Sequence, residues 1–294
     1  MSAQEAAPGH RGEMVGIAGG RRLRLVRAGP EVSSCPTVLL EAGSFGFSAD
    51  WAAVQAGLAA HGLRSLAYDR AGLGHSDPGP EPRDSRAIVW DLEGLLQEAG
   101  EGGPFILCGH SMAGLHVRLF AGRNRDRVRA VVLVDAATPE SMDEPVVRHF
   151  VDQFARLSRL AAWGASAGLQ KPLSGALGDA IGLPLAAKLE KRSAFADVRH
   201  NRWASAEVQV WPQGAEQARA AGPYDPDWPV GVVLTGRDGQ SGARHDMQTA
   251  PARESRHGFI LHAPGANHAS LLGARHGGRV VEAILRAEEA AAKS

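Results

Sequence analysis

The chain has 294 residues, with 32 basic side chains, 32 acidic side chains and two cysteines. A formal net charge of zero argues against the electrostatic attraction that nucleic acids and anionic membranes require, so we expect neither as a partner. Two cysteines without a CxxC or zinc spacing exclude a disulfide scaffold, and the length allows one large domain with its own core.

The N-terminal stretch has neither the basic n-region nor the apolar h-region of a secretory signal. No apolar run approaches the ~20 residues that span a bilayer. We therefore expect a soluble, cytoplasmic protein whose residues 1–12 form a disordered tail.

The first part of the chain alternates strand and helix patterns. Asp84 stands where it can cap a helix, and Asp50 can cap an earlier one. The predicted elements are a hairpin over 14–18 and 22–27, a strand over 37–40, a helix over 51–61, a strand over 63–68 and a helix over 85–99.

The central feature is a short turn between a strand and a helix. An apolar run over 105–108 meets Gly109-His110-Ser111-Met112-Ala113, and a helical pattern follows at once. Such a turn between small residues lifts a serine hydroxyl clear of the sheet in a strained backbone conformation. The pattern predicts that Ser111 is a nucleophile and that the amide of Met112 faces a developing oxyanion.

The remainder predicts an apolar strand over 128–134, then helices only, and finally two more strands and a C-terminal helix. Alternating strands and helices indicate an α/β fold with a doubly wound, mostly parallel sheet. The helical stretch over 137–227 then reads as a cap or lid inserted into a core formed by 13–136 and 228–294. The later elements are helices over 146–163, 183–191, 194–208, 244–256 (broken near Pro251) and 278–291, and strands over 230–234 and 259–262.

Several motifs recur in one order along the chain: LLEAGSFG, YDRAGLGHSD, GHSMAG, VVLVDAATPE and a terminal GANH. Over roughly residues 14–290 the chain resembles the α/β-hydrolase superfamily, in its capped serine esterase, lipase and haloperoxidase-like branch. The resemblance implies the α/β-hydrolase fold, a Ser-His-Asp triad and no metal or organic cofactor. It is less specific for substrate, because this fold hosts many chemistries.

The chain order Ser…Asp…His that the resemblance implies makes His268 the general base. His262 and His276 are the fallback bases, and His110 is expected to pack or to line the pocket wall. For the acid we favour Asp238, in the turn after the strand over 230–234.

Asp135 is the alternative acid, because it ends the strand over 128–134 and also satisfies the chain order. An oxyanion hole needs two amides. We assign Met112 as one donor and Ser44 as the other, with Phe45 as the fallback.

Charges at two strand ends predict one further contact. Glu41 and Arg70 each follow an apolar strand, and a buried carboxylate needs a partner. We expect an ion pair between them beneath the active site.

The sequence thus predicts a serine hydrolase that cleaves a small to medium, largely apolar ester or lactone through an acyl-enzyme. The alternatives are a C–C bond hydrolase or a cofactor-free perhydrolase with the same triad, or a hydrolase-fold receptor with little turnover. An apolar cap, with Phe150, Phe154, Leu157, Trp163 and Trp203 as candidates, favours an apolar substrate group. Oligomeric state cannot be predicted from these features.

Overall fold

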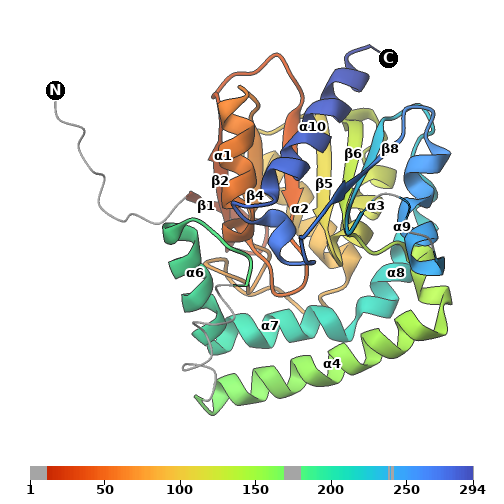
Figure 1. Ribbon diagram of the computed structural model, residues 1–294. Helices are drawn as coiled ribbons and strands as arrows, with labels where there is room; N and C mark the ends of the chain where they lie inside the picture. The colour runs from red at the N-terminus through yellow and green to blue at the C-terminus, as the bar shows by residue number, and fades with distance from the viewer. Residues whose placement is uncertain (1–11, 169–179, 238, 240–241, 294) are drawn as a thin grey trace.

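A single eight-stranded sheet, in the order β1-β2-β4-β3-β5-β6-β7-β8, organises the molecule (Figure 1). The computed structural model describes residues 12–168, 180–237, 239 and 242–293, and most of the predicted tail lies outside them. β1 and β2 form the predicted antiparallel hairpin, and every pairing from β4 through β3 to β8 is parallel. The strands are β1 Glu13–Ile17, β2 Arg21–Ala28, β3 Thr37–Glu41, β4 Ser65–Tyr68, β5 Phe105–His110, β6 Val128–Val134, β7 Val230–Thr235 and β8 Phe259–Ala263.

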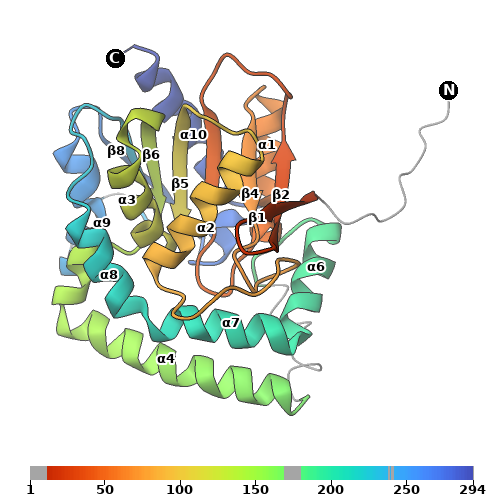
Figure 2. The same cartoon turned by 180° about the vertical axis from the view of Figure 1, so that it is seen from behind.

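Helices cover both faces of this sheet. Because side chains alternate along a strand, Ile106 and Leu107 of β5 enter different apolar clusters, one on each face. Helices α1 and α10 cover one face (Figure 1), and α2 and α3 cover the other (Figure 2). The covering helices are α1 Ala52–Ala60, α2 Ser85–Glu98, α3 Ala113–Arg123, α9 Ala243–Glu254 and α10 Gly277–Ala291.

Between β6 and β7 the described residues form helices and no strand. These inter-strand helices run across the end of the sheet where the parallel strands finish (Figures 1 and 2). Pairs of them pack together, with α4 lying along α7. They are the short η3 Pro139–Asp143, then α4 Pro145–Ser166, α6 Leu185–Ala196, α7 Val198–Gln209 and α8 Trp211–Ala220.

Three local predictions can be compared with the structure. Asp84 caps α2 as predicted, since its Oδ1 accepts the amide of Ala87 at 2.9 Å. Asp50 is not a helix cap: it lies inside η1 (Ser48–Trp51), and its carboxylate binds Lys191 instead. Pro251 does not break α9, which continues across it.

Helix α8 was not predicted, although its buried Trp211, Ala215 and Ala218 follow helical spacing. None of the helices within the described ranges is long and apolar enough to cross a membrane.

Candidate active site

Ser111 occupies the turn between β5 and α3 with a left-handed backbone, at a φ of 58°. A non-glycine residue rarely adopts this conformation, and strain of this kind concentrates at functional sites. The turn is tight on both sides of the serine. A Cβ added at Gly109 would lie 2.7 Å from Val117 Cγ2, and one at Gly114 would lie 2.2 Å from the carbonyl oxygen of Ala137. The small residues therefore let α3 lie against β5 and against the chain that follows β6.

His268, in the loop after β8, contacts a carboxylate at the end of β6. Its Nδ1 lies 2.6 Å from Oδ2 of Asp135, whose side chain is 5% exposed while that of His268 is 47% exposed. Asp135 also has a positive φ, and its Oδ1 accepts a hydrogen bond from Gln248 at 2.8 Å. Asp238, the acid that the sequence favoured, lies outside the described residues, so its assignment stays a prediction.

The charge of Asp135 is stabilised where it lies. Burial alone would raise the pKa of its carboxyl, but the hydrogen bond and charge of His268, with help from Gln248, lower it to about 2. Asp135 is therefore ionised throughout the neutral range. A carboxylate at Nδ1 leaves Nε2 as the nitrogen that can accept a proton, as a general base requires.

His110, the last residue of β5, contacts the same imidazole. The two rings lie with centroids 4.5 Å apart, and Nε2 of His110 is 3.0 Å from the carbonyl oxygen of His268. Burial lowers the pKa of His110 to about 3, so the ring is neutral. A carbonyl can only accept, so Nε2 carries the proton. His110 thereby ties the loop of His268 to the turn that carries Ser111.

The fallback bases lie elsewhere. His262 is inside β8, buried, and stacks on the ring of His245 at 5.7 Å. His276 immediately precedes α10. Among the described contacts Ser111 Oγ makes no hydrogen bond to His268, and such bonds often form only when substrate is bound.

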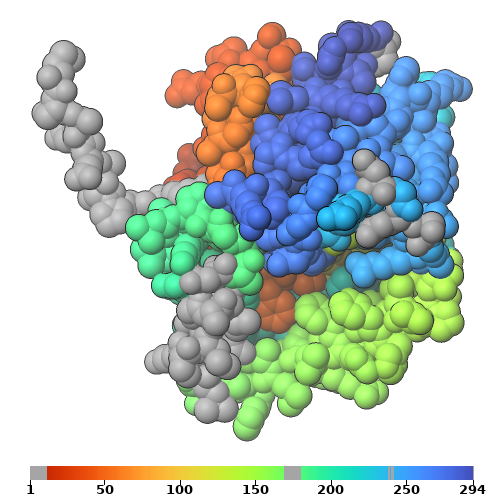
Figure 3. All heavy atoms as spheres, in the orientation of Figure 1, coloured from red at the N-terminus to blue at the C-terminus, as the bar shows by residue number. Residues whose placement is uncertain are grey.

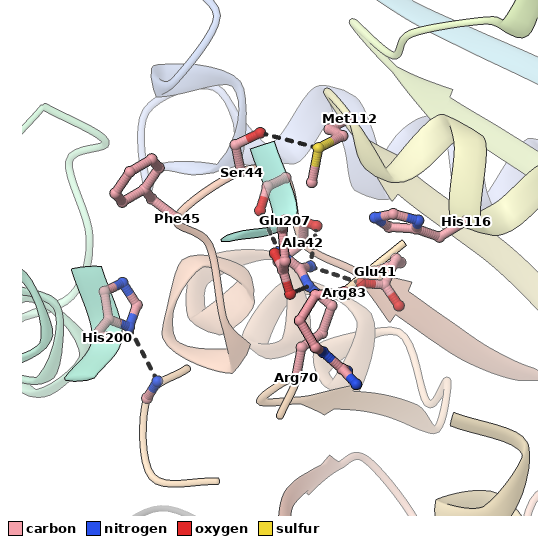
Figure 4. A network of polar contacts seen from close by, with 12 residues as sticks. Glu41, Ala42, Ser44, Phe45, Arg70, Arg83, Met112, His116, His200 and Glu207 are labelled. Atoms are coloured by element: carbon pink, nitrogen blue, oxygen red, sulfur yellow. Dashed lines mark hydrogen bonds and ion pairs between the residues drawn. The ribbon is translucent and has the colours of Figure 1, made fainter. Parts of the chain in front are cut away.

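The loop after β3 lies directly over the nucleophile. A Cβ at Gly43 would be 2.8 Å from Cβ of Ser111, so only glycine allows this approach. Ser44 Oγ contacts Met112 Sδ at 3.4 Å, which joins the two candidate oxyanion donors (Figure 4). Within the described contacts, the backbone amides of Ser44, Phe45 and Met112 donate to no protein acceptor. No described hydrogen bond therefore occupies any of these three amides.

The predicted ion pair between Glu41 and Arg70 is confirmed, with Nη1 of Arg70 2.8 Å from Oε1 of Glu41. Tyr68 donates its hydroxyl to the other oxygen of Glu41 at 2.6 Å. Burial raises the pKa of Glu41, and Arg70 and Tyr68 only partly offset this. Burial would lower the pKa of Arg70, but the neighbouring carboxylates raise it instead, so the guanidinium stays charged.

A second carboxylate on Arg70 was not predicted from the sequence. Glu207 of α7 has a fully buried side chain and lies 2.8 Å from Nη2 of Arg70. It follows Trp203 by four residues and so shares the apolar face of its helix. A lone charge on an apolar helix face was the signal that could have identified it.

The inter-strand helices also bring apolar side chains to this edge. Phe154 of α4 contacts the rings of Phe45 and Trp211, at 6.2 Å and 6.3 Å between centroids. Trp203 is buried against Gly72, where an added Cβ would clash. The other three predicted cap residues are instead exposed, namely Phe150, Leu157 and Trp163.

A space-filling view shows a hollow on this side of the molecule. It opens between the green α6 segment, the yellow-green α4 segment and the blue C-terminal part (Figure 3). Its floor has the red-orange colour of the early chain. In the loop after β3, Ser44 and Phe45 are partly exposed, whereas Gly43 and Gly46 are buried.

Comparison with known proteins agrees with this architecture. Residues 36–205 match the family model described as the alpha/beta hydrolase fold, and the chain belongs to that family. Two solved structures share the fold: a thermophilic esterase from Thermogutta terrifontis (20% identity, TM-score 0.66, covering 93% of this chain and 96% of that one) and the enol-lactonase from Burkholderia xenovorans LB400 (18%, 0.65, 94% and 99%).

Curated relatives match over shorter stretches. A "Probable transporter efuK" from Hormonema carpetanum is 39% identical over 108 residues, which are 35% of this chain and 15% of that protein. The chain thus spans a small part of that relative's length. The family model and the two solved structures agree on the hydrolase fold.

Proposed function

We propose that this hydrolase-fold chain is a serine hydrolase that cleaves a carboxylic ester or lactone through an acyl-enzyme. Ser111 is the nucleophile, His268 the general base and Asp135 the acid that orients it. The observation that carries the proposal is the strained Ser111 turn one strand away from a carboxylate–imidazole contact of 2.6 Å. A serine hydroxyl is a weak nucleophile at its ordinary pKa and needs such a base.

In the proposed reaction, His268 Nε2 takes the proton of Ser111 as Oγ attacks the carbonyl carbon. The amides of Met112 and Ser44 stabilise the oxyanion that forms. His268 then protonates the leaving alcohol, and water, activated by the same imidazole, hydrolyses the acyl-enzyme. Asp135 stabilises the imidazolium at each step without itself being protonated.

The esterase and the enol-lactonase named above share the fold of this chain, which supports an ester or lactone as the proposed substrate. A serine in the turn between β5 and α3 argues against dehalogenase or epoxide hydrolase chemistry, which needs an aspartate at that position. Phe154 and Trp211 share an apolar cluster with Met112, and Phe45 contacts Phe154; these rings suit an apolar acyl or alcohol group. We further propose that the inter-strand helices act as a cap over this group.

The test is hydrolysis of p-nitrophenyl acetate and butyrate, followed by esters and lactones of increasing acyl length. Ser111→Ala is the control and is expected to lose at least about 10⁴-fold in kcat. A wild-type rate no greater than that of Ser111→Ala across the panel would favour a binding protein instead.

A further inference from the structure

The guanidinium of Arg70 uses all five of its N–H donors within the protein. Nε and Nη2 bind the two oxygens of Glu207 at 2.9 Å and 2.8 Å. Nη1 binds Glu41 at 2.8 Å and the carbonyl of Ala42, and Nη2 also binds the carbonyl of Gly43 at 2.9 Å (Figure 4). Because the fork is planar and every donor is engaged, Arg70 cannot turn without breaking several bonds.

Holding the carbonyl of Gly43 also fixes the next amide. The C=O and N–H of a trans peptide point in opposite directions, so the N–H of Ser44 points away from Arg70. Figure 4 shows Arg70 on one side of this loop and the Ser44–Met112 contact on the other. That is the side of the second candidate oxyanion donor.

We propose that Arg70 is a positioning residue for the oxyanion hole and that Glu207 of α7 holds it in place. The docking of α7 then sets how well the Ser44 amide meets the developing charge. This inference rests on the proposed ester hydrolysis, because it concerns the same site. Neither side chain touches the reacting atoms; both act through the backbone of the loop.

A second cation repeats the arrangement from another helix. Lys191 of α6 donates to the carbonyl of Phe45 at 2.8 Å and pairs with Asp50 at 2.8 Å. Carbonyls at three positions within four residues are thus held by buried cations. Arg70 links the loop after β3 to α7, and Lys191 links it to α6. The proposal requires such links, because they make the geometry of the loop depend on how these helices dock.

The chain offers a matched control. Glu190 of α6 binds the buried Arg24 at 2.7 Å, and its described partner is that arginine rather than the loop after β3. Glu190→Gln therefore makes the same chemical change as Glu207→Gln at another contact between an inter-strand helix and a buried arginine. It leaves the hydrogen bonds of the oxyanion loop in place.

The experiment compares wild type, Glu207→Gln, Glu207→Asp and Glu190→Gln, with p-nitrophenyl butyrate as substrate and butylboronic acid as inhibitor. Boron becomes tetrahedral when Ser111 Oγ adds to it, and one of its oxygens then occupies the oxyanion hole, as in the transition state. Thermal unfolding is measured for each protein, and kinetics are run well below its midpoint. Glu207→Asp keeps the charge and remains a test if Glu207→Gln does not fold.

For both Glu207 variants we expect kcat to fall by about tenfold or more, since loss of a whole oxyanion donor costs about 10²–10³. KM should change less than about threefold, because the hole binds the transition state and not the ester. The Ki of butylboronic acid should rise by the factor by which kcat/KM falls. Glu190→Gln should lower thermal stability with little change in kcat.

Two outcomes would overturn the inference, and they are distinguishable. If wild type shows no Ser111-dependent ester turnover, the proposed function fails and this inference fails with it. If wild type is active but the Glu207 variants lose no more kcat than Glu190→Gln, or lose it without weaker boronate binding, Glu207 is only structural and the proposed function stands.

Discussion

The interior of the sheet and the seam beside it are held together in different ways. In β5 and β6 almost every side chain is apolar and buried, as in the run Val131–Val134. The seam, where α6 and α7 meet the loops after β3 and β4, is instead built from buried charges. Its members are Glu41, Asp50, Arg70, Lys191 and Glu207.

Burial of apolar side chains stabilises the folded state without requiring a particular orientation. A buried ion pair requires a defined geometry, and both charged groups lose their hydration. The raised pKa values of Glu41 and Asp50 reflect that loss of hydration. We infer that the sheet supplies most of the stability and that the seam supplies orientation. Three effects can break or sharpen this comparison.

The largest effect is expected at Asp135, where β6 ends beside His268. Asp135→Asn should lower kcat by about 10⁴-fold, because the amide cannot hold the imidazole of His268 in the required tautomer. Asp238→Asn should change it less than about threefold. Steady-state kinetics with p-nitrophenyl butyrate measures both. The reverse pattern would move the acid to Asp238, as the sequence favoured.

The next effect concerns stability in the seam. Lys191→Met leaves Asp50 buried without its partner and should cost about 3–5 kcal/mol, whereas Lys191→Met with Asp50→Leu should recover most of it. Leu107→Ala in β5 should cost about 2–5 kcal/mol through the cavity it leaves. Urea unfolding, with the m-value unchanged between variants, gives each change in the free energy of unfolding.

A control for the seam is an exposed ion pair. Asp225→Asn removes the partner of Arg125 at the surface and should cost less than about 1 kcal/mol. If the double variant at 191 and 50 is no more stable than Lys191→Met, the seam is held by packing and the contrast with the sheet disappears.

The smallest effect is the dependence of stability on pH. The folded pKa of Asp135, about 2, lies below its ordinary 3.8, so its contribution is present above pH 4 and is lost as pH falls toward 2. The advantage of wild type over Asp135→Asn should shrink by about 1 kcal/mol between pH 5 and pH 3. Urea unfolding at each pH measures it.

Asp50 should show the opposite sign. Burial raises its folded pKa, despite the partly offsetting charge of Lys191, so the folded state binds the proton more tightly than the unfolded state. The advantage of wild type over Asp50→Asn should therefore grow as pH falls over the same range. If the stability advantage of wild type changed with pH in the same way for both variants, the distinction between Asp135 at the end of β6 and Asp50 in the seam would be contradicted.

The sequence by itself determined the features that local chemistry fixes. Small residues around Ser111 predicted the tight turn, because a larger side chain at Gly109 would clash with α3. Alternating and continuous apolar runs predicted the strands, and Asp84 predicted the start of α2. The Glu41–Arg70 pair also followed, because both residues end parallel strands that finish at one edge of the sheet.

Only the tertiary structure decided which distant groups meet. Asp135 and Asp238 both satisfy the chain order, and the loop after β8 brings His268 to Asp135. Asp50 read as a helix cap until Lys191 came beside it from 141 residues away. Glu207 met Arg70 because α7 packs over the strand ends. A local pattern fixes what a segment forms, but partners at long range depend on the packing of the whole chain.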